Sequence, residues 1–130
     1  MDAVDSQFLC RGDILADRGR GVRFRLRLGD RVVPAFAIRF RGRVYAYLNQ
    51  CAHQEVELDW QPGHFFDPDR AHLICATHGA LYDPATGACN SGRCAGRALT
   101  AVAVEERDGR VYLVHKTDGV QLNDVEWVDG

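Results

Sequence analysis

The chain has 130 residues, the size of one domain, and 46% of them are hydrophobic, enough to build a core without disulfides. Its formal net charge of −2 argues against a general nucleic-acid binder. The longest apolar run, Val32 to Ile38, is far shorter than the roughly 20 residues of a membrane helix, and the acidic N-terminus does not resemble a signal peptide. We therefore expect a single domain over residues 1–130, located in the cytoplasm, with no membrane span and no nucleic-acid partner.

Charge is unevenly distributed along the chain. The segment from Arg11 to Arg43 has ten Arg and three Asp, whereas residues 51–69 have five acidic residues and no basic one. The tail, residues 117–130, is acidic too, but it also contains apolar residues and Trp127. Because a tryptophan rarely stays fully exposed, we expect this tail to pack on the body of the protein or on a neighbouring chain.

The periodicity of the chain is that of β-strands. Apolar residues alternate with arginines from Val22 to Leu28, which is the pattern of a half-buried strand. Pro34 lacks a backbone donor and indicates a sheet edge or a bulge. No segment has a helical period, so we expect an all-β fold, an antiparallel sandwich or barrel. The other expected strands are Val32–Phe40, Val44–Leu48, Ala98–Glu106 and Val111–His115, with turns at Gly29-Asp30, Gly42 and Asp108-Gly109.

Residues 49–97, between the third expected strand and the last hairpin, read as a long loop. A loop of this length inside a compact domain is usually functional. Four of the five cysteines and four of the five histidines lie in it. In a chain that can fold without disulfides, spaced Cys and His indicate a metal site or catalysis more often than a disulfide framework.

Two short motifs in this segment each combine one thiol with one imidazole. Cys51-Ala52-His53 and Cys75-Ala76-Thr77-His78 each follow an expected strand, with 21 residues between His53 and Cys75. Two Cys and two His are compatible with a structural zinc, or with a two-iron, two-sulfide cluster in which His replaces Cys on one iron. In zinc fingers each short motif supplies two cysteines or two histidines. Here each motif supplies one cysteine and one histidine, an arrangement that suits two different metal ions. The pattern therefore favours Cys51 and Cys75 on one iron, and His53 and His78 on the other.

Such a ligand set has a consequence for the reduction potential. Replacing two thiolates by two neutral imidazoles removes two negative charges from the cluster, so adding an electron becomes easier. Potentials of such centres run from roughly −150 to +300 mV, against about −400 mV for all-Cys plant-type ferredoxins.

With these motifs the chain resembles the Rieske iron–sulfur domain family. The resemblance covers roughly Phe8 to His115, and it is carried by the two ligand motifs with Gly79, by Tyr82-Asp83 and Thr86-Gly87, and by the closing hairpin around Asp108-Gly109. It implies a Rieske-type antiparallel β fold with a small cluster-binding subdomain over residues 49–97. It also implies a [2Fe–2S] cluster bound by Cys51, His53, Cys75 and His78. The second motif looks most like those of small stand-alone bacterial Rieske proteins.

The resemblance implies a cytoplasmic one-electron carrier, a Rieske-type ferredoxin, that is not itself an enzyme. Its expected donor is a flavin-dependent reductase, and its expected acceptor is an oxygenase or another oxidoreductase. One alternative is a non-catalytic Rieske subunit of a larger oxidoreductase complex, and another is a zinc-stabilised interaction module. A self-contained Rieske oxygenase would need a second, large iron-binding domain, for which 130 residues leave no room.

Several positions depart from the family pattern. Respiratory members have a disulfide whose cysteines correspond here to Val56 and Thr77, and a Ser, here Ala80, that donates a hydrogen bond to a sulfide. Tyr82 keeps a hydroxyl that can reach a ligand sulfur, and Glu55 adds negative charge to the first ligand loop. Hydrogen-bond donors to sulfur stabilise the reduced state, so the loss of the Ser donor lowers the potential, and the charge of Glu55 acts in the same direction. We therefore expect a potential in the lower half of the Rieske range.

The remaining Cys and His have more ordinary interpretations. Cys89 and Cys94 lie in a third loop that is expected to cover the cluster, either as free thiols or as a disulfide across four intervening residues. Cys10 reads as a small buried residue or an inert thiol, and His64 and His72 read as exposed loop residues.

Overall fold

The computed structural model describes residues 6–28, 31–50, 58–59, 63–75, 79–91, 97–114 and 120–126. Within these ranges the protein is almost entirely β-strand, which confirms the expected fold class. No helix in these ranges is long and apolar enough to cross a membrane. The elements are β1 (Ser6–Arg11), the 3-10 helix η2 (Gly12–Ile14), β2 (Val22–Leu28), β3 (Arg31–Phe40), β4 (Arg43–Leu48), β5 (Leu73–Ile74), β6 (Leu81–Tyr82), β7 (Cys89–Ser91), β8 (Ala101–Val102), β9 (Val104–Arg107), β10 (Arg110–Val114) and β11 (Val120–Glu126).

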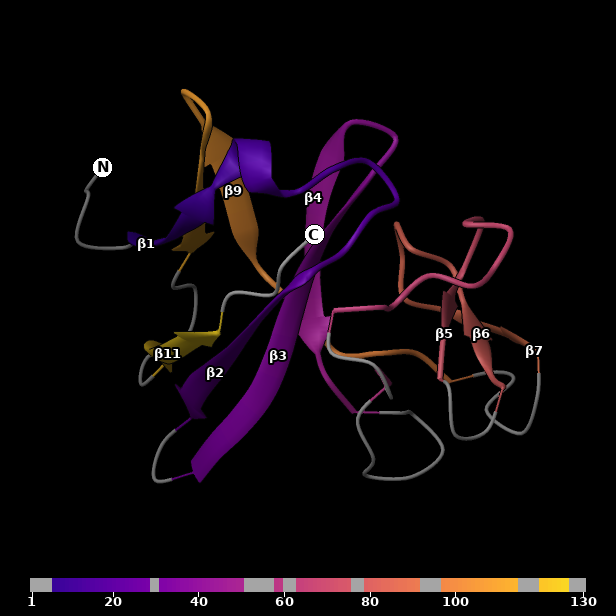
Figure 1. Ribbon diagram of the computed structural model, residues 1–130. Helices are drawn as coiled ribbons and strands as arrows, with labels where there is room; N and C mark the ends of the chain where they lie inside the picture. The colour runs from indigo at the N-terminus through magenta and orange to yellow at the C-terminus, as the bar shows by residue number, and fades with distance from the viewer. Residues whose placement is uncertain are drawn as a thin grey trace.

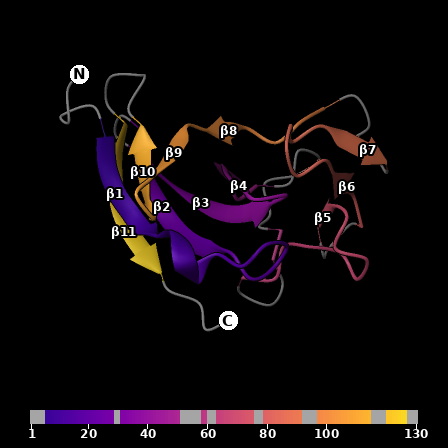
Figure 2. The ribbon, with the colours of Figure 1, turned by 90° about the horizontal axis from the view of Figure 1, so that it is seen from above.

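The strands form three antiparallel sheets. Their orders are β1-β10-β9, β11-β2-β3-β4-β8 and β5-β6-β7. In both Figure 1 and Figure 2 the small sheet β5-β6-β7 lies at one end of the molecule, and β1 and β11 lie at the other. The long strands β2, β3 and β4 cross the middle and connect the two ends (Figure 1).

Two parts of the chain differ from the sequence-based expectation. The strand expected over Ala98–Glu106 is interrupted at Ala103, and its two halves belong to different sheets, since β8 pairs with β4 and β9 pairs with β10. Strands β1, β6 and β7 were not expected, because two of them are very short and none has a clear alternation. Residues 120–126 of the acidic tail form β11, which extends the central sheet beside β2.

The register of β11 places acidic residues of the tail opposite two of the three arginines of β2. Asp124 is opposite Arg25 in the ladder, and Glu126 is opposite Arg23. Opposite charges at cross-strand positions favour pairing of two strands. The basic strand and the acidic tail are therefore adjacent in the folded protein although about 100 residues separate them in the sequence.

Strand β3 is buried on both faces and separates two clusters of buried side chains. Phe36 and Ile38 belong to one cluster, and Val33, Ala35 and Ala37 belong to the other. This alternation follows from the two-residue period of a strand. The first cluster continues into the small sheet through Phe65, whose ring stacks on Phe36 with the centroids 4.0 Å apart.

Pro34 lies in this central strand rather than at an edge or a bulge, so that expectation is wrong. It pairs with Arg25 on the β2 side, but the ladder with β4 begins only at Ala35. The missing N–H of Pro34 therefore leaves no gap in the ladder with β4. Its carbonyl is used, because it accepts a hydrogen bond from the backbone N of Asn49 at 2.9 Å.

Arg39, near the end of β3, connects the central sheet to the first sheet. Its guanidinium donates to the carbonyl oxygens of Gly12, Leu15 and Gly42 at 2.7–3.0 Å. It also forms a two-pronged ion pair with Glu106 of β9, at 2.9 and 2.6 Å. These hydrogen bonds from Arg39 hold the pKa of Glu106 below its ordinary value.

We expect Arg39→Met to lower the free energy of unfolding by about 2 kcal/mol, because three carbonyls and the Glu106 carboxylate, on an exposed residue, lose their donor. Urea unfolding measures the loss. Arg43→Met, at an exposed position of β4, is the matched control and should change stability by less than about 0.5 kcal/mol.

The same ion pair makes stability depend on pH. Since the pKa of Glu106 is depressed in the folded protein, its contribution is present at neutral pH and is lost as the pH falls through that lowered value. Glu106→Gln should therefore destabilise the protein at pH 7 and have little effect in strong acid. An equal loss at both pH values would contradict this assignment.

Candidate metal centre

Cys75 is the one sequence-predicted ligand that lies within the described residues. It follows β5 directly, its side chain is completely buried, and it forms no disulfide. The other three predicted ligands, Cys51, His53 and His78, lie outside the described residues. Accordingly, no group of three or more His, Cys, Asp or Glu side chains is found in the part of the chain that the structure describes.

The backbone on either side of the second motif turns sharply. Cys75 N donates to Ala80 O at 2.9 Å, and Gly79 N donates to Cys75 O at 2.7 Å. Gly79 has a φ of +72°, a conformation that side-chain-bearing residues adopt only with strain. Ala80 is buried, as a residue packed at the base of such a turn should be.

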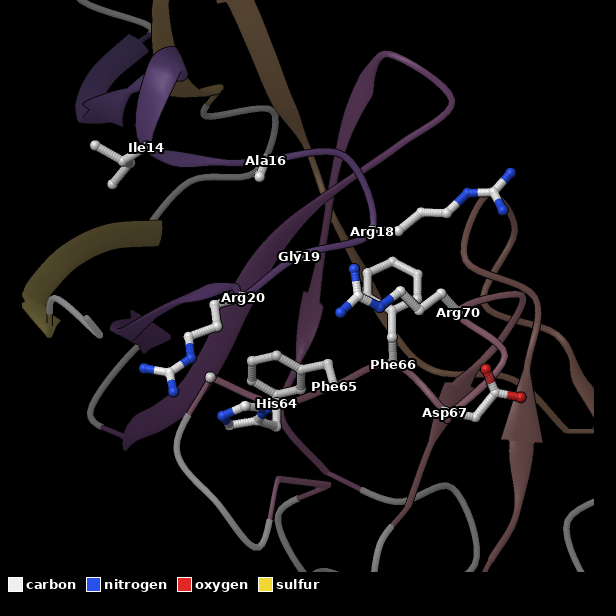
Figure 3. Close-up of a pocket in the computed structure, with 11 residues that line it drawn as sticks. Ile14, Ala16, Arg18, Gly19, Arg20, His64, Phe65, Phe66, Asp67 and Arg70 are labelled. Atoms are coloured by element: carbon white, nitrogen blue, oxygen red, sulfur yellow. The ribbon is translucent and has the colours of Figure 1, made fainter. Parts of the chain in front are cut away.

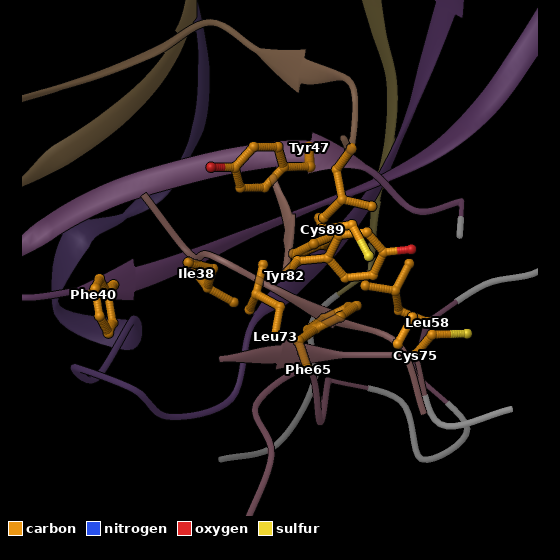
Figure 4. Close-up of a cluster of buried hydrophobic side chains, with 12 residues drawn as sticks. Ile38, Phe40, Tyr47, Leu58, Phe65, Leu73, Cys75, Tyr82 and Cys89 are labelled. Carbon is orange, nitrogen blue, oxygen red and sulfur yellow. The ribbon is translucent and has the colours of Figure 1, made fainter. Parts of the chain in front are cut away.

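Cys75 belongs to the cluster of buried side chains that joins β3 and β4 to the small sheet. Leu58, Leu73 and Tyr82 are all fully buried in the same cluster. Figure 4 shows the Cys75 sulfur and the Tyr82 hydroxyl directed to the same side of this cluster. The sequence singled out Tyr82 for a hydroxyl that can reach a ligand sulfur, and its position beside Cys75 is consistent with that role.

Tyr47 fixes the turn that joins β6 and β7. Its hydroxyl donates to Pro84 O at 2.8 Å, and burial raises its pKa above the ordinary value. The turn is closed by Gly87 N donating to Asp83 O at 2.7 Å. Gly87 has a φ of +80°, and a Cβ there would be 2.8 Å from the Tyr47 ring, so glycine is needed for both reasons. The Tyr82-Asp83 and Thr86-Gly87 motifs thus build a rigid turn beside the candidate site.

Cys89 of β7 is disulfide-bonded, which the sequence left open. Cys10 and Cys75 form no disulfide, so the partner of Cys89 lies outside the described residues, where the sequence has Cys51 and Cys94. The side chain of Cys89 lies against Tyr82 in the buried cluster that also contains Cys75 (Figure 4). This disulfide therefore lies within the wall of the candidate site.

Cys10 has no part in this site. It lies in the other cluster of buried side chains, on the far side of β3, and it is completely buried. Burial raises its pKa to about 12, so its thiol stays protonated and unreactive at neutral pH. The expectation of a small buried residue with an inert thiol is confirmed.

A separate hollow of about 310 Å³ lies between the segment that precedes β2 and the segment that leads to β5 (Figure 3). Its charged lining is mostly basic, with Arg18, Arg20 and Arg70, and it contains no cysteine. His64 lines it and is exposed, as expected, whereas His72 is only half-exposed, with a ring nitrogen 3.8 Å from Asp67. A basic hollow without thiols does not suit an iron–sulfur cluster.

Sequence reasoning missed two buried polar residues next to the site, Asn49 and Asp59. They are the buried polar or charged residues of the described part of the chain, at 1% and 6% exposure. An amide directly after an apolar strand was the available signal for Asn49, because a residue that ends a strand must satisfy the first backbone groups of the loop. Asp59 gave no such signal, since its charged partner, Arg23, is 36 positions away in the sequence.

Comparison with known proteins places these features in context. The model of the Rieske [2Fe–2S] domain family matches residues 8–117. No curated protein sequence matches the chain. Among solved structures, the ferredoxin of carbazole 1,9a-dioxygenase from Nocardioides aromaticivorans IC177 is 23% identical, with a TM-score of 0.65, and the match covers 85% of this chain and 98% of that one.

Two further structures are similar. The ferredoxin of Sphingomonas yanoikuyae B1 is also 23% identical, with a TM-score of 0.65 and the same coverage, 85% of this chain and 98% of that one. The terminal oxygenase of carbazole 1,9a-dioxygenase from Nocardioides aromaticivorans IC177 is 20% identical, with a TM-score of 0.68, but the match covers 87% of this chain and only 30% of the oxygenase chain. At these identities the likeness establishes the fold.

We expect Cys94 to be the disulfide partner of Cys89. Two of the five cysteines are then oxidised, so three thiols should react with a thiol reagent in the metal-free, denatured, unreduced protein, and five after reduction. Peptide mapping identifies the bond. Because the bond would close a loop of only six residues, Cys94→Ser should lower the free energy of unfolding by about 2 kcal/mol. Five reactive thiols before reduction, or a bond from Cys89 to Cys51, would contradict this pairing.

Proposed function

The chain belongs to the Rieske [2Fe–2S] domain family, and from that premise we propose that it is a one-electron carrier of the Rieske ferredoxin type. The observation that carries the proposal is the family match over residues 8–117, which includes both ligand motifs. The cofactor of this family is a Rieske-type [2Fe–2S] cluster, which accepts and donates one electron at a time when bound. The similarity to two ferredoxins over 98% of their length supports a carrier rather than an enzyme.

We propose Cys51, His53, Cys75 and His78 as the ligands of that cluster. Cys75 fits the role, because its thiol forms no disulfide and is buried directly after a strand, in the same cluster as Tyr82. The sharp turn between Cys75 and Ala80 is the kind of backbone that brings a thiol and an imidazole three positions apart in the motif to one site. We further propose that residues 49–97 form the cluster-binding subdomain of a single domain over residues 1–130, with residues 117–130 as its acidic tail.

The surrounding residues are suited to electron transfer without large rearrangement. Leu58, Leu73 and Tyr82 are fully buried around Cys75 and exclude water from one side of the site. The turn held by Tyr47 and Gly87 and the disulfide at Cys89 limit the movement of β6 and β7. A rigid, partly dry environment lowers the reorganisation that accompanies a change of charge, since fixed groups need not reorient.

We propose an oxygenase, or another oxidoreductase, as the electron acceptor and a flavin-dependent reductase as the donor. A solved complex of reduced oxygenase and oxidized ferredoxin in carbazole 1,9a-dioxygenase contains a similar fold, with 21% identity and a TM-score of 0.63. It supports an acceptor of the oxygenase class.

A second candidate function is that of a non-catalytic Rieske subunit in a larger oxidoreductase complex. The similarity to 30% of a terminal oxygenase chain favours it, because the same fold works there as part of a larger assembly. The two candidates differ in one measurable property. A free carrier purifies alone and reduces its acceptor at a rate that rises with carrier concentration, whereas a subunit co-purifies with its partner in a fixed ratio.

We also propose that the carrier works in the cytoplasm. The disulfide at Cys89 runs against this location, because structural disulfides are uncommon in a reducing compartment. Burial of Cys89, at 8% exposure, supports its persistence there, since a thiol reductant must reach the sulfur to attack it.

The proposal predicts two irons and two acid-labile sulfides per chain, and a rhombic signal from the reduced protein by electron paramagnetic resonance. Cys75→Ala should abolish the cluster, whereas Cys10→Ala should keep it. Both side chains are completely buried, so the pair separates loss of a ligand from loss of core packing. Iron and sulfide analysis of anaerobically purified protein measures both.

The imidazole ligands are tested separately. His53→Cys or His78→Cys should lose the cluster or lower its potential toward the range of all-thiolate clusters, about −400 mV. His64→Cys, at an exposed position, is the control and should leave the spectrum unchanged. A wild-type spectrum and potential in either of the first two variants would show that the replaced His is not a ligand.

A further inference from the structure

Three polar side chains from distant parts of the sequence meet beside the candidate metal centre. Asn49 follows β4, Asp59 follows the first ligand motif by six residues, and Arg23 lies on β2. The Asp59 side chain has no exposed surface, and Arg23 is only 21% exposed. Burying an amide, a carboxylate and most of a guanidinium is unfavourable unless each is paired, so this arrangement calls for a reason.

Asn49 closes the loop that carries Cys51 and His53. Its side-chain Oδ1 accepts a hydrogen bond from Leu58 N at 2.8 Å, and its Nδ2 donates to Asp59 Oδ1 at 2.9 Å. Its own backbone N is fixed by Pro34 O of β3. One amide side chain thus holds residue 49 against residues 58 and 59, and the first ligand motif lies between these two ends.

Asp59 connects the closed loop to the body of the protein. Its Oδ2 accepts a hydrogen bond from Gly63 N at 2.9 Å and lies 3.3 Å from Arg23 Nε. Gly63 O in turn accepts from Gly21 N, immediately before β2, at 2.9 Å. The loop is therefore fastened to β2 through one ion pair and one backbone hydrogen bond.

The same contacts fix the first ligand loop relative to the second. Leu58, held by Asn49, is fully buried in the cluster of side chains that contains Cys75. The Asn49 side chain thus ties Leu58, which follows the first ligand motif, to the cluster that contains Cys75.

We propose that Asn49, Asp59 and Arg23 form a buried polar clasp that holds the first ligand loop in place and sets the reduction potential of the centre. The inference rests on the proposed function, because the potential responds only if Cys51 and His53 bind the cluster. Charges in a buried site are weakly screened. The carboxylate therefore opposes the arrival of an electron nearby, the guanidinium favours it, and the two effects offset each other in the intact pair.

Removing one charge at a time should shift the potential in opposite directions. Asp59→Asn keeps the shape of the side chain and removes the negative charge, so the equilibrium should move toward the reduced cluster by about tenfold. Arg23→Met removes the positive charge and should move it toward the oxidised cluster by a similar factor. Tenfold corresponds to about 59 mV for a one-electron couple, which a spectroscopic redox titration resolves.

Matched controls are available for both variants. Asp69→Asn removes an exposed carboxylate from the segment that follows the first ligand loop, and Arg27→Met removes an exposed guanidinium from the same strand as Arg23. Both should stay within twofold of the wild-type equilibrium, since solvent screens exposed charges. Shifts of Asp59→Asn and Arg23→Met in the same direction, or no shift in either, would overturn the assignment, because a purely structural contact does not distinguish the sign of a charge.

A charge exchange tests the clasp itself. Asn49→Asp keeps an acceptor for Leu58 N but places a second carboxylate against Asp59, so cluster loss, followed as bleaching in air, should be at least fivefold faster. The double variant Asn49→Asp with Asp59→Asn restores an amide–carboxylate pair with the partners exchanged and should recover most of the wild-type lifetime. A double variant no more stable than Asn49→Asp alone would overturn the proposal.

Iron and sulfide content of the wild type is measured first on the same samples. A wild type without a cluster refutes the proposed function. A loaded wild type whose clasp variants have unchanged potential and lifetime refutes only the clasp.

Discussion

The burial of β3 on both faces is the constraint on which the rest of the structure depends. Its alternating side chains enter two separate cores, one shared with the first sheet and one shared with the small sheet that contains β5. A strand in this position cannot shift by one residue without exchanging the two sets of side chains. The elements that build the candidate metal centre are therefore held against a surface whose register is fixed.

Beyond that surface, regular hydrogen-bonded structure becomes scarce and individual side chains take over its role. The sheet β5-β6-β7 has strands of only two or three residues. Asn49 closes the base of one ligand loop, Gly79 permits the turn of the other, and Tyr47 anchors the turn between β6 and β7.

The two cores treat cysteine differently, and the difference follows from their surroundings. Cys10, packed among aliphatic side chains, has a raised pKa and no route to chemistry. Cys75, equally buried, directly follows a strand and shares its cluster with Tyr82. Burial alone therefore does not distinguish the proposed ligand Cys75 from Cys10; the cluster in which each thiol lies does.

Charged residues of β2 face acidic residues from two other parts of the chain, β11 and the segment after the first ligand motif. Two of the three arginines of β2, Arg23 and Arg25, have acidic residues of β11 opposite them in the ladder, and Arg23 also lies beside the buried Asp59. The basic strand β2 therefore contacts acidic residues from two distant parts of the chain. The acidic tail pairs with it as β11, and Asp59 lies beside Arg23.

The sequence by itself determined the all-β class, three long strands of the central sheet and the family, because those depend on local patterns: a two-residue period, turn residues, and Cys and His at short spacing. It did not determine the strand order, the break at Ala103, the position of Pro34 in a central strand, or the disulfide at Cys89. The contacts of Arg39 with Glu106, and of Asn49 and Arg23 with Asp59, were equally beyond it. The two ion pairs, Arg39–Glu106 and Arg23–Asp59, join residues more than 30 positions apart. Only the packing of the chain decides which arginine meets which carboxylate.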